Sequence, residues 1–375
     1  MMKIAYILPS FSGDFERPNG GVESASINLI LGLLEIKSDV KVFLVYPNVN
    51  QIIRGIPKGI ITVPVNSFFR HVWTYNYPLI GISKRMEKAI EDLNPDIVHV
   101  QGAPGFFRKR EFKKLFLTIH GIPYLDSKFQ KRLGSRIRSL LTEMIYKYDL
   151  KRYDNVVFLG NYGYSLLKKD ICKRAKVYFV PNPIAMRKNF KIYPENQVTV
   201  LFFSGILRPL KNIEAIVEAC NKLKIRKVNF FLKFAGKFHS IEYEQKIKAL
   251  IDSFNLTSNI VFLGQLSSKE MEIELNSVDI NLLPSFQEVC PMSIIEAMAL
   301  GKPTIASSVG GVPDIIINTY NGYLIPIDNS EELANKICLL TDSSNYKAMR
   351  EKCLNMVGVF DCVNIAERTL QYYLE

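Results

Sequence analysis

The chain has 375 residues, of which 48% are hydrophobic and 22% charged, so the composition is that of a globular protein with room for two domains of ordinary size. No run approaches about 18 consecutive apolar residues, and the six cysteines are scattered without a Cys-x-x-Cys pair, which argues against a membrane-spanning helix, a disulfide framework and a zinc site. The formal net charge of +12 lies in the first half, because residues 1–185 hold 28 Lys and Arg against 15 Asp and Glu, whereas residues 186–375 hold 20 against 21.

The first half alternates short apolar runs with helical patterns, which predicts repeated β-α-β units and a parallel sheet. The run at its start, 3–8, is too short for a signal sequence and charged residues follow it, so we expect a first strand and a cytoplasmic protein. The predicted strands cover residues 3–8, 40–46, 60–65, 96–100, 115–119, 154–158 and 177–180.

A second series of strands follows a polar stretch at 182–197, which contains two prolines and predicts a linker. Its apolar runs cover residues 198–204, 228–235, 259–263, 278–283, 303–306 and 322–326. We therefore expect an α/β protein of two doubly wound, Rossmann-like domains that face a central cleft, with ligands at the carboxyl ends of the strands. The predicted domains are 1–185 and 186–360, followed by a C-terminal helix at 361–375.

Gly20 and Gly21 stand between the first strand and a helix predicted to begin near Val22. A backbone without Cβ atoms can approach a ligand closely, and the helix N-terminus that follows favours phosphate. An ordinary structural turn explains a Gly-Gly pair as well. The absence of a Gly-x-Gly-x-x-Gly sequence here argues against a dinucleotide oxidoreductase.

The basic excess is concentrated in residues 106–152, which hold 13 Lys and Arg against 4 Asp and Glu. Apolar residues recur at helical spacing among these cations, namely Phe129, Leu133, Ile137, Leu140, Leu141, Met144 and Ile145. Such a helix can lie on an anionic membrane surface, and a packed helix with a solvated basic face is the alternative. We expect no nucleic-acid partner, because no binding motif or aromatic stacking pattern accompanies the charge.

His120 follows an apolar run at 115–119 and precedes Gly121. A polar side chain at the carboxyl end of that strand would face the predicted cleft, where ligands of such folds bind. A hydrogen-bonded structural histidine is the alternative.

Two glutamates, Glu288 and Glu296, lie on either side of a predicted helix start. The apolar run at 278–283 predicts a buried parallel strand. Pro291 fits the first position of the following helix, and Gly301 fits its C-terminal cap. Glu288 is therefore expected in the loop before the helix and Glu296 inside it.

The N-cap predicted for this helix, Cys290, is a poor hydrogen-bond acceptor, so Pro291, Met292 and Ser293 begin a helix whose N–H groups can bind an anion. A carboxylate on either side could hold hydroxyls of the same ligand, which suggests a nucleotide-sugar site. A glycosidase also needs two carboxylates, but it does not explain the helix N-terminus. Two solvated surface acids do not fit the apolar residues around Glu296.

Three motifs occur together in the second half: Glu-Val-Cys-Pro-Met-Ser-Ile-Ile-Glu-Ala-Met-Ala-Leu-Gly at 288–301, Val-Gly-Gly-Val-Pro-Asp at 309–314 and Ser-Gly-Ile-Leu-Arg-Pro-Leu-Lys-Asn at 204–212. They resemble the retaining glycosyltransferases of family 4, which have the two-domain GT-B fold. The resemblance covers about residues 198–326. It continues more weakly through Gly20-Gly21-Val22-Glu23, Thr118-Ile119-His120-Gly121 and Val180-Pro181-Asn182-Pro183.

The resemblance implies that Glu288 contacts hydroxyls of the donor sugar, that Glu296 binds the nucleotide ribose, and that Lys211 binds the donor diphosphate from the turn that contains Gly205. A solvated helix start is the alternative for Lys211. The family arginine that acts with this lysine has Ile206 at its position here. Arg208, two residues on, is the nearest cation that could take its place.

The resemblance further places His120 beside the reacting sugar and implies that Gly310 and Gly311 shape the nucleotide pocket before a short helix at 312–317. It also implies that Phe360–Tyr373 crosses back to the first domain. Val289 and Cys290 replace the Gly-Phe of many relatives where the backbone approaches the donor, so the motifs do not predict the sugar.

We therefore expect a retaining, hexosyltransferase-type enzyme that moves a sugar from a nucleoside-diphosphate sugar to a lipid-linked or polysaccharide acceptor at the inner face of a membrane. No cofactor or metal is expected, because no clear ligand cluster occurs and GT-B enzymes usually work without one. A nucleotide-sugar epimerase of the same fold and a non-catalytic nucleotide-sugar-binding subunit are the alternatives. The base, the sugar, the acceptor, the linkage and the oligomeric state are not predicted.

Overall fold

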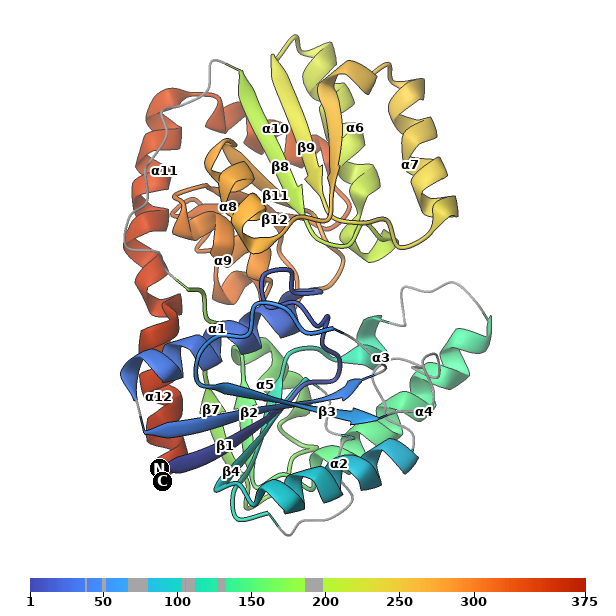
Figure 1. The fold of residues 1–375 in the computed structure, drawn as a ribbon. Coiled ribbons are helices and arrows are strands. Elements are labelled where there is room, and N and C mark those ends of the chain that lie inside the picture. Colours follow the sequence, from blue (N-terminus) through green and yellow to red (C-terminus); the bar gives the residue numbers. More distant parts are fainter. Residues whose placement is uncertain are drawn as a thin grey trace. The chain divides into compact units, whose positions relative to one another are not determined.

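The chain forms two compact units, one of Met1–Ala185 together with Phe360–Glu375 and one of Met186–Val359. Each unit has a parallel sheet with helices packed on it (Figure 1). No described helix is long and apolar enough to cross a membrane. The computed structural model describes residues 1–37, 39–48, 52–66, 80–102, 105, 112–126, 133–185 and 198–375.

The first unit is built on a seven-stranded parallel sheet in the order β3-β2-β1-β4-β5-β6-β7. Its strands are β1 (Met2–Ile7), β2 (Val40–Asn48), β3 (Ile60–Asn66), β4 (Ile97–Gln101), β5 (Leu115–Ile119), β6 (Asn155–Phe158) and β7 (Lys176–Phe179). Every residue of β4 and β5 is buried, because helices cover both faces at the centre of the sheet. This explains why the two strands are nearly continuous apolar runs.

Helices pack on both faces of this sheet. They are α1 (Gly21–Ile36), α2 (Ile80–Leu93), α3 (Pro123–Asp126), α4 (Leu133–Leu150), α5 (Asn161–Leu167) and α12 (Cys362–Leu374). Met86 of α2 and Tyr146 of α4 belong to the hydrophobic core on one face. Leu33 of α1 and Ile365 of α12 belong to the core on the other face.

Helix α12 belongs to the first unit although it follows the second unit in the sequence. It packs along α1, and a Cβ atom at Gly32 would lie 2.2 Å from the carbonyl oxygen of Cys362. Only glycine therefore permits this close approach. At the other end of α12, the hydroxyl of Tyr373 is hydrogen-bonded to that of Tyr6 at 2.8 Å inside the core.

The second unit has a six-stranded parallel sheet in the order β10-β9-β8-β11-β12-β13. Its strands are β8 (Thr199–Ser204), β9 (Phe230–Ala235), β10 (Ile260–Gly264), β11 (Ile280–Leu283), β12 (Thr304–Ser307) and β13 (Gly322–Ile325). Its helices are α6 (Ile213–Ile225), α7 (Ile241–Ser253), α8 (Ser268–Asn276), α9 (Met292–Ala299), α10 (Ser330–Leu340) and α11 (Ser343–Met356). Short 3-10 turns are η3 (Pro209–Lys211), η4 (Thr257–Asn259), η5 (Val312–Asp314) and η6 (Val357–Phe360).

Each strand predicted from the sequence is present, with bounds within two residues of the prediction, and the doubly wound α/β fold is confirmed. The predicted helix at 312–317 is wrong, because only the 3-10 turn η5 forms there. The side chain of Asn321 explains the difference. It accepts the N–H of Ile317 at 2.8 Å and donates to the carbonyl of Ile315 at 3.1 Å, so these backbone groups are not free for a helix.

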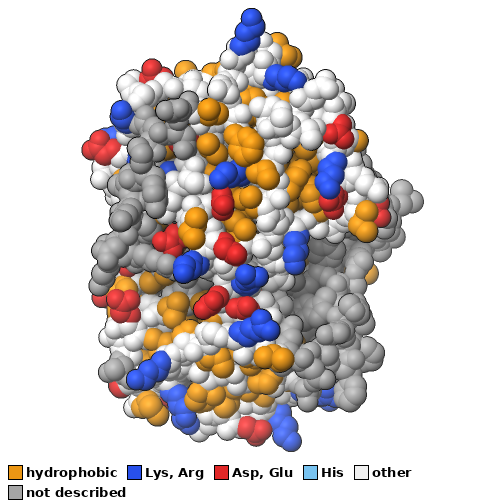
Figure 2. Space-filling model, turned by 45° about the horizontal axis from the view of Figure 1, so that its top comes forward, with side chains coloured by type: hydrophobic (Ala, Val, Ile, Leu, Met, Phe, Trp, Pro, Cys, Tyr) orange, Lys and Arg blue, Asp and Glu red, His pale blue; other side chains and the backbone are white. Residues whose placement is uncertain are grey.

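Charged side chains of both signs are interspersed on the face that Figure 2 shows, and hydrophobic side chains appear between them in small groups. Among the described residues of this face, Lys and Arg side chains are therefore not gathered into a single patch.

Candidate functional site

In each sheet the strand order changes direction once, and open α/β sheets bind ligands outside the carboxyl ends of strands at such a point. The change lies between β1 and β4 in the first sheet and between β8 and β11 in the second. Gly21 and His120 follow β1 and β5, whereas Lys211 and Glu288 follow β8 and β11. The predicted residues thus lie at the carboxyl edge of one sheet or the other.

Lys211 and Glu288 form an ion pair that joins Nζ to Oε1. Lys211 ends the turn η3, and Glu288 lies in the loop between β11 and α9. Their side chains are only 16% and 10% exposed, so solvent screens the attraction weakly. The cation predicted for the phosphate and the acid predicted for the sugar are thus in direct contact.

Backbone contacts hold the loop that carries Glu288. The N–H of Phe286 donates to the carbonyl of Leu210 at 2.9 Å, which joins this loop to η3. The N–H of Gly311 donates to the carbonyl of Glu288 at 3.2 Å. A Cβ atom at Gly311 would lie 1.9 Å from the carbonyl oxygen of Val289, so the loop could not pack there against any other residue.

The turn after β8 also depends on glycine. Gly205 has a φ of 144°, a backbone conformation that other residues rarely adopt. A Cβ atom at Gly236, after β9, would lie 1.9 Å from the carbonyl oxygen of Gly205. The path from β8 to η3 is therefore fixed by two glycines.

Helix α9 begins one residue later than the sequence predicts. Pro291, not Cys290, is the N-cap residue, and it has extended backbone with no side-chain cap hydrogen bond. Because a proline side chain carries no acceptor, the N–H groups of Met292 and Ser293 gain no cap, and the N-terminus keeps the character of an anion site. The helix ends as predicted, since Gly301 takes the left-handed φ of 66°.

Glu296 lies on the second turn of α9 and is half-buried. Burial raises the pKa of its carboxyl from 4.5 to about 7, because the charged form loses hydration. This group therefore changes charge close to neutral pH.

The surroundings of Gly310, Ile206 and Arg208 do not by themselves indicate which part of a ligand each residue would contact. Gly310 has a φ of 53°, so the turn before η5 itself requires glycine. Ile206 is 47% exposed, which leaves an apolar side chain at the place of the family arginine. Arg208 is half-buried just before η3. Contacts of Gly310 and Arg208 with a ligand stay predictions.

In the first unit, Gly20 is the N-cap of α1 and has a φ of 104°. A Cβ atom there would meet nothing within 4 Å, so conformation and not crowding explains this glycine. Gly21 begins the helix, one residue before the predicted start. The loop ahead is tied to the buried Glu23, whose carboxylate accepts the N–H groups of Ser12 and Asn19 at 3.1 Å each.

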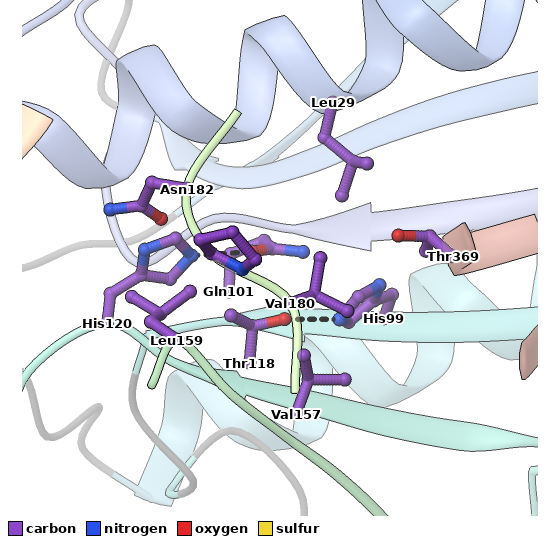
Figure 3. A pocket seen from close by; sticks show the side chains of 11 residues that line it. Leu29, His99, Gln101, Thr118, His120, Val157, Leu159, Val180, Asn182 and Thr369 are labelled. Carbon is purple, nitrogen blue, oxygen red and sulfur yellow. Dashed lines mark hydrogen bonds between the residues drawn. The ribbon is translucent and has the colours of Figure 1, made fainter. Parts of the chain in front are cut away.

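His120 lies directly after β5 and contacts Gln101, the last residue of β4. Its Nε2 is 2.7 Å from Oε1 of Gln101. The side chain of Asn182 lies beside the ring (Figure 3), and the Nδ1 atom of His120 has no hydrogen bond to any described residue. These residues line a small cavity of about 20 Å³, together with His99 and Thr118.

A buried chain of hydrogen bonds connects this cavity to α12. His99 is bonded through Nε2 to Oγ1 of Thr118 at 2.7 Å and through Nδ1 to the hydroxyl of Tyr373. Burial lowers the pKa of His99 to about 3 and that of His120 to about 4. Both imidazoles are therefore neutral near pH 7 and can donate and accept hydrogen bonds.

Two family models match the chain and together span most of its length. Residues 19–188 match the model described as Glycosyltransferase Family 4, and residues 186–355 match the one described as Glycosyl transferases group 1. The chain belongs to the family 4 glycosyltransferases. Its two Rossmann-like units are those of the GT-B fold.

Individual relatives agree with this assignment. The N,N'-diacetylbacillosaminyl-diphospho-undecaprenol α-1,3-N-acetylgalactosaminyltransferase of Campylobacter jejuni is 26% identical over 309 residues, 76% of each chain. Sucrose-phosphate synthase from Thermosynechococcus elongatus superposes with a TM-score of 0.82 at 20% identity, over 100% of this chain and 98% of that one. HepE of Anabaena in complex with UDP-glucose superposes with a TM-score of 0.71 at 15% identity, over 99% of each chain.

Sequence reasoning missed several polar residues of this glycosyltransferase. Gln101 ends a buried strand just as His120 follows one, so the same argument could have found it. Asn182 was noticed only as part of a family motif. Three buried serines at the carboxyl ends of β8, β11 and β12 also have hydroxyls with no hydrogen bond to any described residue, namely Ser204, Ser285 and Ser307. Serine is too common at strand ends to give a signal.

The basic stretch is described in part, since 106–111 and 127–132 lie outside the described residues. Helix α4 carries an exposed apolar face made of Leu140, Leu141, Met144, Ile145 and Tyr148, which are between 49% and 69% exposed. The opposite face is buried through Ser139, Tyr146 and Leu150. The predicted amphipathic helix exists, and much of its apolar stripe faces outward.

No three His, Cys, Asp or Glu side chains of the described residues gather in a way that could hold a metal ion. The expectation of a glycosyltransferase without metal or other cofactor remains a prediction.

Proposed function

We propose that this chain is a retaining glycosyltransferase that moves a hexose-type sugar from a nucleoside-diphosphate sugar to an acceptor hydroxyl. The contact between Lys211 and Glu288 carries the proposal. In such a donor, C1 of the sugar is bonded to the terminal phosphate, so a cation for the phosphate and an acceptor for sugar hydroxyls must be neighbours. This pair supplies both groups at the carboxyl edge where ligands bind.

In the proposed reaction the bond between C1 and the phosphate oxygen breaks, and its electron pair stays with the diphosphate. The acceptor oxygen bonds to C1 on the same face, and its proton passes to the leaving phosphate. Lys211, the N-terminus of α9 and Arg208 stabilise the charge that develops on that phosphate. Glu288 binds sugar hydroxyls and is not a nucleophile.

Glu296 is proposed to accept hydrogen bonds from the ribose, and Gly205, Gly310 and Gly311 to let the backbone pass close to the nucleotide. Hydroxyl donors favour the charged carboxylate, so bound nucleotide would lower the pKa that burial raises to about 7.

The first unit is proposed to bind a lipid-linked acceptor, with His120 beside the reacting sugar. The Campylobacter relative is named for an acceptor carried on diphospho-undecaprenol. The net charge of +13 in residues 1–185 suits an anionic acceptor of this kind, since 28 cations stand against 15 acids.

The exposed face of α4 is proposed to lie in an anionic membrane surface, which would make the enzyme peripheral on the inner face of the membrane. Its apolar residues are spaced along one side of the helix, and residues 106–152 hold 13 cations against 4 acids. Apolar insertion and electrostatic attraction then act together.

Sedimentation with vesicles of phosphatidylglycerol and phosphatidylcholine tests the membrane proposal. We expect binding at low salt that weakens at high salt, and loss of binding when Leu141 and Met144 are both changed to Ser. Ile273→Ser is the matched control, because Ile273 is equally exposed on α8 of the other unit. No binding at low salt would overturn the proposal.

Product analysis with a labelled donor tests the reaction. We expect a labelled glycoside whose anomeric configuration, read by NMR, is that of the donor, and a yield that EDTA does not reduce. An inverted product would contradict the retaining mechanism. A new sugar nucleotide formed without acceptor would indicate an epimerase, and binding of the donor without turnover would indicate a non-catalytic subunit.

A further inference from the structure

Gln101 has no part in the reaction proposed above, yet it is placed to control His120. It is the last residue of β4 and pairs in register with Thr118 of the neighbouring parallel strand β5. His120 follows Thr118 by two residues, so its ring reaches back toward the end of β4. Its Nε2 then lies 2.7 Å from Oε1 of Gln101.

The contact is buried and is therefore costly to lose. Gln101 is 1% exposed, and its Nε2 makes no hydrogen bond to any described residue. A small cavity of about 20 Å³ adjoins it, with room for about one water molecule. Burial of Gln101 and its contact with the ring favour the observed position of Oε1.

Burial keeps the ring neutral, and its neighbours are uncharged. Asn182 faces the other side of the imidazole, so both ring nitrogens are next to neutral amides (Figure 3). Among the described residues that line the cavity there is no carboxylate, and the one other titratable group is His99, which burial keeps neutral. Burial lowers the pKa of His120 and the contact with Asn182 acts in the opposite direction, whereas a carboxylate in place of either amide would raise this pKa further.

We infer that Gln101 is a positioning residue that fixes the plane of the His120 imidazole beside the sugar. The inference rests on the proposed role of His120 in transfer. A sugar hydroxyl can donate to or accept from a neutral ring, and an amide can serve either ring tautomer. If Gln101 fixes the ring, the hydrogen bond between His120 and the sugar hydroxyl keeps its geometry during the reaction.

Three variants test the inference through kcat, KM and the pH profile of transfer. Gln101→Met keeps the volume but removes the hydrogen bond, and we expect kcat to fall roughly tenfold or more with KM for the donor little changed. Gln101→Glu puts a carboxylate beside Nε2, and we expect the pKa of His120, followed by NMR, to rise by about one to three units. The acid limb of the kcat profile should rise with it.

Thr118→Val is the matched control, because it removes the hydrogen bond to His99 in the same cavity and leaves the contact between Gln101 and His120 intact. We expect it to lower Tm but to leave kcat and the pH profile unchanged. Melting curves of all variants establish that they fold. If both Gln101 variants kept the kcat and pH profile of the unaltered enzyme, or if Thr118→Val reproduced their changes, the inference would be overturned.

His120→Ala separates this inference from the function on which it rests. If it lowers transfer strongly while Gln101→Met does not, the positioning role fails and the proposed function stands. If His120→Ala leaves transfer unchanged, the role of His120 fails and the inference fails with it. If neither the unaltered enzyme nor any variant transfers sugar, the proposed function itself is contradicted.

Discussion

In the second unit Lys211 and Glu288 meet as a charged pair, whereas in the first unit His120 is neutral between the amides of Gln101 and Asn182. Both sets of side chains are at least partly removed from water, and burial lowers the pKa of His120 because the ring has no oppositely charged partner. Lys211 and Glu288 each have an oppositely charged partner, which offsets the cost of burying an ion. The charged pair suits a donor that carries both a diphosphate and sugar hydroxyls, and the neutral imidazole suits a hydroxyl that donates or accepts a hydrogen bond.

The largest expected effect comes from removing the cation. Lys211→Met should lower kcat by about 10²- to 10³-fold, because it takes a fixed positive group from the leaving phosphate. It also leaves Glu288 buried without its partner, so Tm should fall. Initial rates of transfer measure the first effect and melting curves the second. Lys269→Met, in the first turn of α8, is the control, and a loss of less than about threefold in Lys211→Met would place the phosphate elsewhere.

The Glu288→Gln variant tests whether a neutral amide can replace the carboxylate in the second unit, since neutral amides contact His120 in the first unit. We expect kcat to fall about tenfold to a hundredfold, since hydrogen bonds from hydroxyls to a carboxylate are stronger than those to an amide. Transfer kinetics at saturating acceptor measure the change. Activity equal to that of the unaltered enzyme would mean that charge at this position serves only to hold Lys211.

Gly311→Ala tests whether the charged pair depends on its backbone support. The new Cβ would lie 1.9 Å from the carbonyl oxygen of Val289, so the loop of Glu288 must move. We expect a loss of about 1–3 kcal/mol in the free energy of unfolding and a lower kcat. Gly358→Ala is the matched control, because a Cβ atom there meets nothing within 4 Å. Equal denaturation curves for the two variants would count against the contact.

Glu296 gives a smaller, pH-dependent effect. Its pKa is raised from 4.5 to about 7, so the folded protein holds a proton there that the unfolded chain has lost. Glu296 contributes to the free energy of unfolding below about pH 4.5. This contribution is at most about 3 kcal/mol, and it is lost as the pH rises through 7. Glu296→Gln should therefore flatten the fall in Tm between pH 6 and pH 8. Parallel Tm curves for the two proteins would contradict the raised pKa.

Affinity for the nucleotide should rise with pH, whereas the contribution of Glu296 to stability falls. A ribose that donates hydrogen bonds to Glu296 prefers the ionised carboxylate, so affinity for the nucleotide should rise by up to about tenfold from pH 6 to pH 8. Calorimetric titration at the two pH values measures it. The Glu296→Gln variant should bind more weakly and without this pH dependence, and an unchanged dependence would remove Glu296 from the site.

The strands could be predicted from the sequence because buried parallel strands leave uninterrupted apolar runs, as β4 and β5 do. The contact between Lys211 and Glu288 could not, because it depends on the backbone hydrogen bond from Phe286 to Leu210, which no residue type encodes. The family motif placed both residues near one donor without implying that they touch.

Local errors had local causes. The N-cap of α9 is Pro291 and not the predicted Cys290, because proline, with its fixed φ, tolerates the extended backbone before the helix. The helix expected at 312–317 is replaced by a turn because Asn321 takes its backbone groups. Gln101 was overlooked although the rule that selected His120, a polar side chain at the carboxyl end of a buried strand, applies to it equally.

The central proposal is that Lys211 and Glu288 form the donor site, and a thermal-shift panel of UDP-, GDP- and ADP-sugars tests it most directly. A ligand that binds only the folded state raises Tm by an amount that grows with the ratio of its concentration to its Kd. We predict that at least one of these donors raises the Tm of the unaltered protein and that Lys211→Met largely abolishes this rise. An equal rise in both proteins, or no rise with any nucleotide sugar, would contradict the proposed donor site.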